Sequence, residues 1–180
     1  MAEMQIELVE PCESFRQAYI EYVEEFRLAG ETVVGQWGDV DEDFSAFVQR
    51  LRDYAHGINL PDEWVPAATF WLVRGGHVIG TADLRHRLTK ALKDVGGHVG
   101  YGVRPSERGK GYATLMVKLV LERARKLSLK QVLITCDKDN LASARVIQKN
   151  GGQLDSESIS KQTGKLKQRY WIELTKIRSE

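Results

Sequence analysis

The sequence is poor in cysteine and proline, and it has no long apolar run. Its two cysteines, Cys12 and Cys136, lie far apart without the close spacing of a metal or redox motif, so two free thiols are expected and no metal site is predicted. No apolar run approaches the roughly 18 residues that a membrane helix needs. The first residues lack a signal pattern, so we expect a cytoplasmic protein.

Excess charge of either sign is also missing. The chain has 26 basic and 25 acidic residues, for a net charge of +1. This balance gives no general attraction to nucleic acid or to a membrane surface, and neither partner is predicted. With 180 residues, of which 42% are hydrophobic, the chain is expected to form a single domain over residues 1–180.

The hydrophobic pattern predicts strands and helices that alternate along the chain. Period-two alternation or short apolar runs predict strands near 5–10, 68–74, 77–87, 97–103, 132–136, 153–155 and 165–174. Helical spacing predicts helices near 15–30, 44–57, 109–127 and 140–150. Residues 88–95 fit either a short helix or an ordered loop, and 156–164 read as a polar turn. This order predicts a mixed α/β sheet.

A glycine-rich loop at residues 100–113 joins a predicted strand to a predicted helix. Gly109 and Gly111 allow unusual backbone angles and close approach of a ligand. The helix that follows offers unpaired N–H groups at its positive end, and Arg108 and Lys110 add full charges. The combination predicts a socket for phosphate or pyrophosphate.

Two familiar nucleotide loops are excluded. The chain has no G-x-x-x-x-G-K-[ST] run, and neither glycine pair continues as G-x-G-x-x-G. An ATP or nicotinamide site is therefore not expected.

Two motifs together resemble the GNAT superfamily of N-acetyltransferases. Residues 108–113, Arg-Gly-Lys-Gly-Tyr-Ala, match its (Q/R)-x-x-G-x-(G/A) signature, and residues 140–152, which begin Asn-Leu-Ala-Ser, resemble its second motif. The resemblance covers roughly residues 70 to 174. It implies a GNAT-like fold, with a central, mostly antiparallel sheet, a splayed parallel strand pair and flanking helices. It also implies acetyl-CoA as the acyl donor.

The resemblance also assigns roles in donor binding. Backbone groups near Tyr101 and Val103 would pair with the pantetheine arm, and the N–H of Val103 or of a neighbour would bind the oxyanion. Asn140, which also suits a helix cap, would hydrogen-bond the arm with Ser143 close by. The pyrophosphate would lie on the backbone N–H groups of Arg108, Gly109, Lys110, Gly111, Tyr112 and Ala113.

One position departs from the family pattern. Many members carry a tyrosine one helical turn after Ser143, and it protonates the departing thiolate; this chain has Ile147 there. Tyr112 and Tyr170 are candidate substitutes. A thiol pKa near ~8.5 also allows the thiolate to leave without a proton donor.

Several residues are candidates for the general base. His98 has the titration range of a base, but strand alternation puts it out of phase with Tyr101 and Val103. Asp83 and His86 on the neighbouring strand, Glu25 on the first helix and a water chain are the alternatives.

The sequence therefore predicts an acetyl-CoA-dependent N-acetyltransferase that transfers acetyl directly to a primary amine. The alternative is a non-catalytic acyl-CoA-binding or regulatory module on the same fold. The acceptor stays open as a small-molecule or peptide amine, and an exposed final hairpin could support a homodimer. The loop 31–43, with Trp37, either closes over the acceptor or anchors itself to the core.

Overall fold

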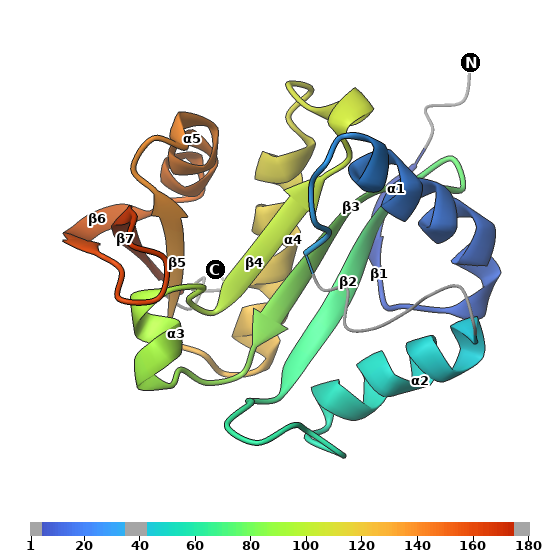
Figure 1. Cartoon of the computed structure of the whole chain (residues 1–180), viewed down its shortest axis with the longest axis horizontal. Helices are drawn as coiled ribbons and strands as arrows, with labels where there is room; N and C mark the ends of the chain where they lie inside the picture. Colours follow the sequence, from blue (N-terminus) through green and yellow to red (C-terminus); the bar gives the residue numbers. More distant parts are fainter. Residues whose placement is uncertain (1–4, 35–42, 175–180) are drawn as a thin grey trace, which may run out of the picture.

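The computed structural model describes residues 5–34 and 43–174, and Figure 1 shows their arrangement. The strands are β1 (Ile6–Val9), β2 (Ala67–Arg74), β3 (His77–Arg85), β4 (Val99–Val103), β5 (Gln131–Asp137), β6 (Gln153–Ile159) and β7 (Leu166–Glu173). The α-helices are α1 (Arg16–Leu28), α2 (Phe44–Ala55), α3 (Lys90–Asp94), α4 (Tyr112–Lys126) and α5 (Leu141–Lys149). Short 3₁₀ turns, Glu13–Phe15 and Pro105–Glu107, precede α1 and the glycine loop.

The strands form two antiparallel sheets, in the orders β1-β2-β3-β4 and β5-β7-β6. Strands β4 and β5 point the same way and diverge toward their carboxyl ends (Figure 1). At the closed end of this splay the His98 N–H donates to the Leu133 carbonyl at 2.7 Å. The predicted mixed α/β fold with a splayed parallel pair is thereby confirmed.

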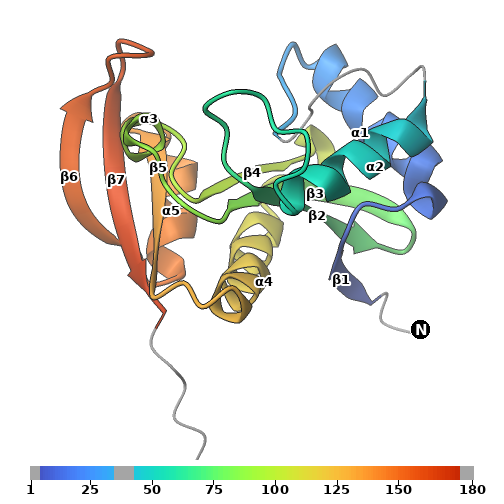
Figure 2. The ribbon, with the colours of Figure 1, turned by 90° about the horizontal axis from the view of Figure 1, so that it is seen from below.

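Helices cover both faces of the first sheet, with α1 and α2 on one side and α4 on the other (Figure 2). The α1–α2 side packs through aromatic side chains, among which Tyr19 stacks on Trp71 with ring centroids 4.5 Å apart. The α4 side packs through aliphatic side chains, including Met116, Val117 and Val120, which are fully buried. The two sides of β3 and β4 therefore face different environments.

Local signals place most element ends where they were predicted. Asp43 caps α2, its carboxylate accepting the Ala46 N–H at 3.0 Å, and Asn140 caps α5 by accepting the Ser143 N–H at 3.0 Å. Residues 90–94 form the short helix that was one of two alternatives for that segment. No helix in residues 5–34 and 43–174 is long and apolar enough to cross a membrane.

The polar turn predicted at 156–164 was wrong in its first part. Strand β6 continues to Ile159 and pairs with β7, with Ser158 opposite Lys167. This strand forms the exposed edge of its sheet, so it needs no apolar face and carries no alternating signal. Trp37 and most of the predicted 31–43 loop lie outside the described residues.

Candidate active site

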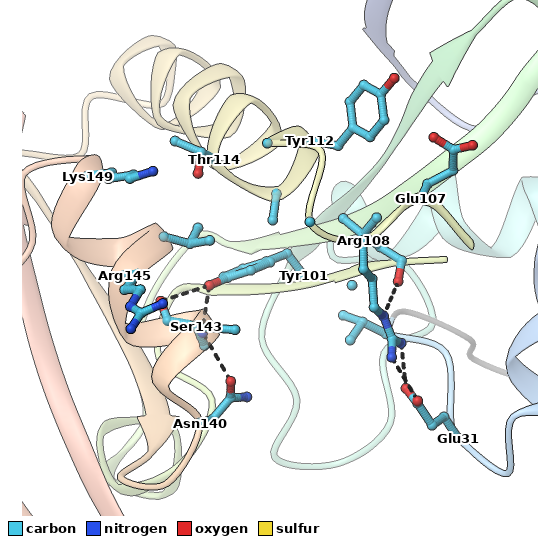
Figure 3. A pocket seen from close by; sticks show the side chains of 18 of the residues that line it. Glu31, Tyr101, Glu107, Arg108, Tyr112, Thr114, Asn140, Ser143, Arg145 and Lys149 are labelled. Carbon is cyan, nitrogen blue, oxygen red and sulfur yellow. Dashed lines mark hydrogen bonds and ion pairs between the residues drawn. The ribbon is translucent and has the colours of Figure 1, made fainter. Parts of the chain in front are cut away.

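A cavity of about 580 Å³ opens where β4 and β5 separate (Figure 3). Its walls come from the end of α1, the strand β4, the glycine loop with the start of α4, and the first turns of α5. Most predicted donor-binding residues line it, namely Tyr101, Val103, Arg108, Gly109, Gly111, Tyr112, Ala113, Asn140 and Ser143. Sequence positions more than forty apart are thus brought together around one cleft.

The glycine loop has the geometry of an anion socket. Gly109 and Gly111 have φ of +77° and +86°, and a Cβ at either position would meet no atom within 4 Å. No acceptor in the described part of the chain binds the backbone N–H groups of Gly109, Lys110, Gly111, Tyr112, Ala113 or Thr114. These free N–H groups stand at the positive end of a 15-residue helix and fit a pyrophosphate.

The two cations of the loop are engaged by carboxylates. The Arg108 guanidinium forms two hydrogen bonds to Glu31, at 2.8 and 2.6 Å, and a third to the Val103 carbonyl at 3.0 Å. Lys110 pairs with Glu107 at 3.1 Å and does not line the cavity. Backbone N–H groups therefore form the floor of the socket, and the Arg108 side chain lines the same cavity.

Two further cations line the cleft from α5. Arg145 and Lys149 face the glycine loop across the cavity (Figure 3). Neither forms an ion pair with the residues that the structure describes. The sequence analysis missed both, although their spacing of one helical turn would place them on one face of a helix.

The register of β4 directs alternate backbone groups into the cleft. His98 and Arg104 hydrogen-bond through their backbones to β3, at 2.8 and 3.0 Å. In an antiparallel ladder the residues between such pairs turn their N–H and C=O groups away from the partner strand. Tyr101 and Val103 are among these residues, and the Val103 carbonyl accepts from Arg108. Their N–H groups therefore face the opening between β4 and β5.

The Tyr101 side chain crosses the cleft from β4 to α5 (Figure 3). Its hydroxyl lies 2.8 Å from the Ser143 hydroxyl and 3.4 Å from the Ser143 carbonyl. Burial raises the pKa of Tyr101 to about 12, so the phenol keeps its proton at neutral pH. The sequence analysis considered only the backbone of Tyr101. Its phenol lies in the cleft, whereas Ile147, which stands at the family's tyrosine position, is buried in the core.

Tyr112 and Tyr170, the predicted proton donors, have other partners. The Tyr112 ring points away from Tyr101 and Ser143 (Figure 3), and its hydroxyl accepts a hydrogen bond from Arg74. The Tyr170 hydroxyl donates to the Gln168 side chain at 2.8 Å and does not line the cavity. In this structure neither hydroxyl is directed at the space between β4 and α5.

His98 connects the two sheets at the closed end of the splay. It is 6% exposed, and its Nδ1 accepts the Leu133 backbone N–H at 2.9 Å. Burial and the nearby Arg85 lower the pKa of His98 to about 4, so the imidazole is neutral above that pH. The side chain does not line the 580 Å³ cavity.

Asp83 is fully buried on the α1–α2 face of β3, directly opposite Gly100 of β4. One carboxyl oxygen accepts the Thr69 hydroxyl at 2.7 Å, and the other has no hydrogen-bond partner. Burial raises the pKa of Asp83 to about 6. A buried polar atom without a partner is uncommon. Like His98, Asp83 does not line the 580 Å³ cavity.

The other two candidates for the base differ from Asp83. The Glu25 carboxylate is held by Arg104 and by the Ser106 backbone N–H, both at 2.6 Å, so its acceptor positions are occupied. His86 has one buried ring nitrogen without a partner, and burial lowers its pKa. His86 does not line the cleft.

Comparison with known proteins assigns the fold to a family. A family profile described as "Acetyltransferase (GNAT) domain" matches residues 15–153, which is most of the chain. A search of curated protein sequences gave no match.

Solved structures with the same fold match almost the whole chain. One is the acetyl transferase from Salmonella typhimurium that modifies the N-terminal serine of ribosomal protein L7/L12, with TM-score 0.68, 16% identity, and 96% of this chain and 97% of that chain covered. Another is the ribosomal-protein-S5-alanine acetyltransferase from Vibrio fischeri, with TM-score 0.68, 16% identity, and coverage of 96% and 95%.

A third similar structure contains the donor. It is the microcin C7 self-immunity acetyltransferase in complex with acetyl-CoA and AMP, with TM-score 0.65, 14% identity, and coverage of 94% and 93%. At these identities the similarity establishes the shared fold, and the family profile establishes membership. The chain belongs to the GNAT acetyltransferase family and is an acetyl-CoA-dependent N-acetyltransferase.

Proposed function

We propose that the protein transfers acetyl directly from donor to amine across β4, with the donor on one side of the strand and the acceptor on the other. The single observation that carries this proposal is the asymmetry of β4. Tyr101 and Val103 turn free N–H groups into the cleft, whereas Gly100 and Gly102 present no side chain to the α1–α2 face. Glycine in a strand often marks close approach of a ligand.

The donor fits the cleft through backbone groups. Acetyl-CoA supplies an acyl group on a thioester, which is activated for attack by an amine. The free N–H groups after Gly109 match the pyrophosphate, and Asn140 and Ser143 bound the path of the pantetheine arm. The Tyr101 and Val103 N–H groups would donate to the arm and to the negative charge that develops on the carbonyl oxygen.

We assign the general base to Asp83. Its pKa of about 6 leaves the carboxylate ionised at neutral pH while it stays basic enough to accept a proton from the attacking amine. Asp83 is fully buried and lines neither cavity, so its oxygen without a partner would take the proton of the amine through a bridging water. Its position opposite Gly100 places it beside the strand where the amine must attack.

We assign proton donation to Tyr101. As the C–N bond forms and the C–S bond breaks, Asp83 takes one proton from the amine and the phenol gives one to the sulfur. The Ser143 hydroxyl at 2.8 Å orients the phenol and connects it to solvent at the start of α5. The phenol is protonated throughout the neutral range because burial keeps its pKa near 12.

The test of this function separates donor binding from turnover. Calorimetry should detect CoA binding to the purified protein, and thiol release from acetyl-CoA should depend on an added amine. CoA binding without thiol release across a wide panel of amines would instead favour a non-catalytic acyl-CoA-binding module.

Partners and compartment remain predictions. We infer a small-molecule or peptide amine as the acceptor, and a cytoplasmic location because acetyl-CoA must be supplied there. Strand β6 is a sheet edge whose Leu154 and Ile159 are 50% and 69% exposed, which suits the predicted homodimer. Sedimentation at several protein concentrations would test the dimer.

A further inference from the structure

A second cavity, of about 280 Å³, lies on the α1–α2 side of the first sheet. It is bounded by the end of α2, the loop before β2, the end of β3 and α3. Its walls are mainly apolar or aromatic, formed by Tyr54, Leu60, Trp64, Val65 and Leu92. Tyr54 and Trp64 meet edge to face, with ring centroids 5.8 Å apart. The cavity has the size and character of a pocket for an apolar side chain.

One cation, Arg85, lines this cavity. Its Nη1 donates to the carbonyls of Gly96 and Gly97, at 3.3 and 3.2 Å, and no other hydrogen bond engages its guanidinium within the described residues. No carboxylate of those residues lies within ion-pair distance of it. Burial lowers the pKa of Arg85 and the charge of Asp83, on the same face of β3, raises it. The Nε and Nη2 of Arg85 have no hydrogen-bond partner among the described residues, so a bound anion would stabilise this guanidinium.

Arg85 also reaches the strand where acetyl transfer would occur. Its Nη1 and Nη2 lie 3.8 and 3.9 Å from the point that a Cβ on Gly100 would occupy. Covalent geometry puts the Tyr101 nitrogen only ~3 Å from that point, so the guanidinium is within ~7 Å of the Tyr101 N–H, one of the two N–H groups that the proposed function directs at the acyl donor. Asp83, two residues earlier on β3, faces the same side.

We propose that Arg85 binds a carboxylate of the acceptor, and that the acceptors are compact amino acids with one carboxylate and an apolar or aromatic side chain. This inference rests on the proposed direct transfer across β4. A separation of at most ~7 Å accommodates an amine one carbon away from a carboxylate that is hydrogen-bonded to the guanidinium. The side chain would then extend into the 280 Å³ cavity.

Charged residues at the rim of the cavity restrict the class of acceptors further. Asp62 and Glu63 line it and are exposed, so they would repel a second negative charge on the ligand. A peptide N-terminus presents a neutral amide where an amino acid presents its carboxylate, so it would form no charge-assisted pair with Arg85. The site therefore favours free amino acids over protein N-termini.

The experiment compares matched acceptors with the intact protein. L-Phenylalanine and L-leucine are each assayed against their amides and against phenethylamine or isoamylamine, with thiol release from saturating acetyl-CoA as the readout. We expect kcat/KM to be about 10- to 100-fold higher for the amino acids, the range of a charge-assisted pair. Arg85→Gln should remove this preference. Arg85→Lys should keep part of it, because lysine keeps the positive charge but cannot donate two parallel hydrogen bonds to a carboxylate.

A binding measurement keeps the test independent of turnover. 3-Phenylpropionate, which has a carboxylate and no amine, should bind the CoA-saturated wild-type protein and bind Arg85→Gln at least tenfold more weakly. Arg87→Gln, at an exposed position on the same segment, serves as the matched control and should change neither readout. CoA affinity should be unchanged in all three variants.

The possible results distinguish a failure of the carboxylate site from a failure of acetyl transfer itself. Equal rates for amino acids, amides and simple amines in the wild type would overturn the carboxylate site while leaving acetyl transfer intact. An Arg85→Gln protein that loses activity equally on all acceptors, with a lower melting temperature, would show that Arg85 only stabilises the fold through its hydrogen bonds to Gly96 and Gly97. Absence of thiol release with every amine would instead count against the proposed function.

Discussion

The two faces of β4 are built in opposite ways. The cleft face is continuous in sequence, because Tyr101, Val103 and the glycine loop follow one another along a single strand, turn and helix. The α1–α2 face is assembled from distant segments: Arg85 of β3 and Val34 of the segment after α1 pack over Gly100, and Asp83 of β3 is paired with it. A donor shared by a whole family suits a local motif, whereas an acceptor site can change by altering separate segments.

The largest expected effect is on the acceptor face. Asp83→Asn keeps the shape of the side chain and an oxygen for Thr69, but it cannot accept the proton of the amine. We expect kcat to fall by roughly 10²–10⁴-fold with unchanged CoA affinity. The kcat/KM of the wild type should rise with pH through about 6, which forms the acidic limb of its pH–rate profile. The variant should lack this acidic limb.

A second substitution sharpens that assignment. The Thr69 hydrogen bond lowers the pKa of Asp83, so Thr69→Val should move the acidic limb to higher pH without abolishing activity. A limb that stays in place would exclude Asp83 as the group that titrates. A well-folded Asp83→Asn protein with normal turnover would remove it from the mechanism.

The next effect is on the donor face. Gly111→Val places a branched side chain in the open space above the socket, and we expect CoA affinity measured by calorimetry to fall at least tenfold. Because Gly111 has a φ of +86°, the variant should also lose some stability. Gly164, with a φ of +68° and no neighbour within 4 Å of its Cβ position, is the matched control. Gly164→Val should lose comparable stability and bind CoA normally; equal affinities in the two variants would reject the socket.

A smaller effect is expected where the cleft face meets α5. Tyr101→Phe removes the hydroxyl but preserves the packed ring, and we expect kcat to fall about tenfold with little change in CoA affinity. A larger proton-donor effect is not expected, since a thiolate can leave unaided when the thiol pKa is near ~8.5. Steady-state kinetics with thiol detection measures this, and a kcat equal to that of the wild type would restrict Tyr101 to packing.

The smallest effect is a difference in the pH dependence of stability. The folded-state pKa of Asp83 is raised from 3.8 to about 6, so its contribution makes stability fall as pH rises from about 4 to 6. The folded-state pKa of His98 is lowered from 6.5 to about 4, so its contribution makes stability rise over that window. In the wild type the two contributions oppose each other.

Replacing either residue should reveal the pH dependence of stability that the other contributes. Between pH 4 and 6, urea unfolding should show stability rising more steeply with pH in Asp83→Asn than in the wild type, and less steeply in His98→Gln. His98→Gln should also be less stable at neutral pH, through loss of the Leu133 hydrogen bond, and its folded fraction should turn over normally. Parallel pH curves for all three proteins would contradict these assignments, and a loss of turnover in folded His98→Gln would return the histidine to the mechanism.

The sequence predicted the donor side well because its signals are local. Strand, glycine loop and helix are adjacent, and the caps at Asp43 and Asn140 depend on hydrogen bonds within one turn. The edge strand β6 was missed in part because its partner β7 provides the register while its own side chains stay exposed. Local pattern carries no information about such a pairing.

The acceptor side could be predicted only as a set of alternatives. His98 was the first candidate, with Asp83, His86 and Glu25 as alternatives, and the differences among them arise from tertiary contacts. The Leu133 N–H occupies the His98 nitrogen, whereas Asp83 has an oxygen without a partner. Arg85 was not among the predicted residues, since an isolated arginine on a strand gives no signal until its neighbours show that part of its guanidinium has no hydrogen-bond partner.

The pair between Arg108 and Glu31 has a consequence for the order of binding. It joins the donor socket to the segment that leads from α1 over the glycines of β4, through hydrogen bonds of 2.8 and 2.6 Å. A donor phosphate that draws the guanidinium toward itself would release Glu31 and so alter the acceptor's entrance. Thermodynamic linkage makes such coupling reciprocal, so the acceptor would change donor affinity by the same factor. Disrupting the pair should therefore weaken the dependence of each ligand's affinity on the other.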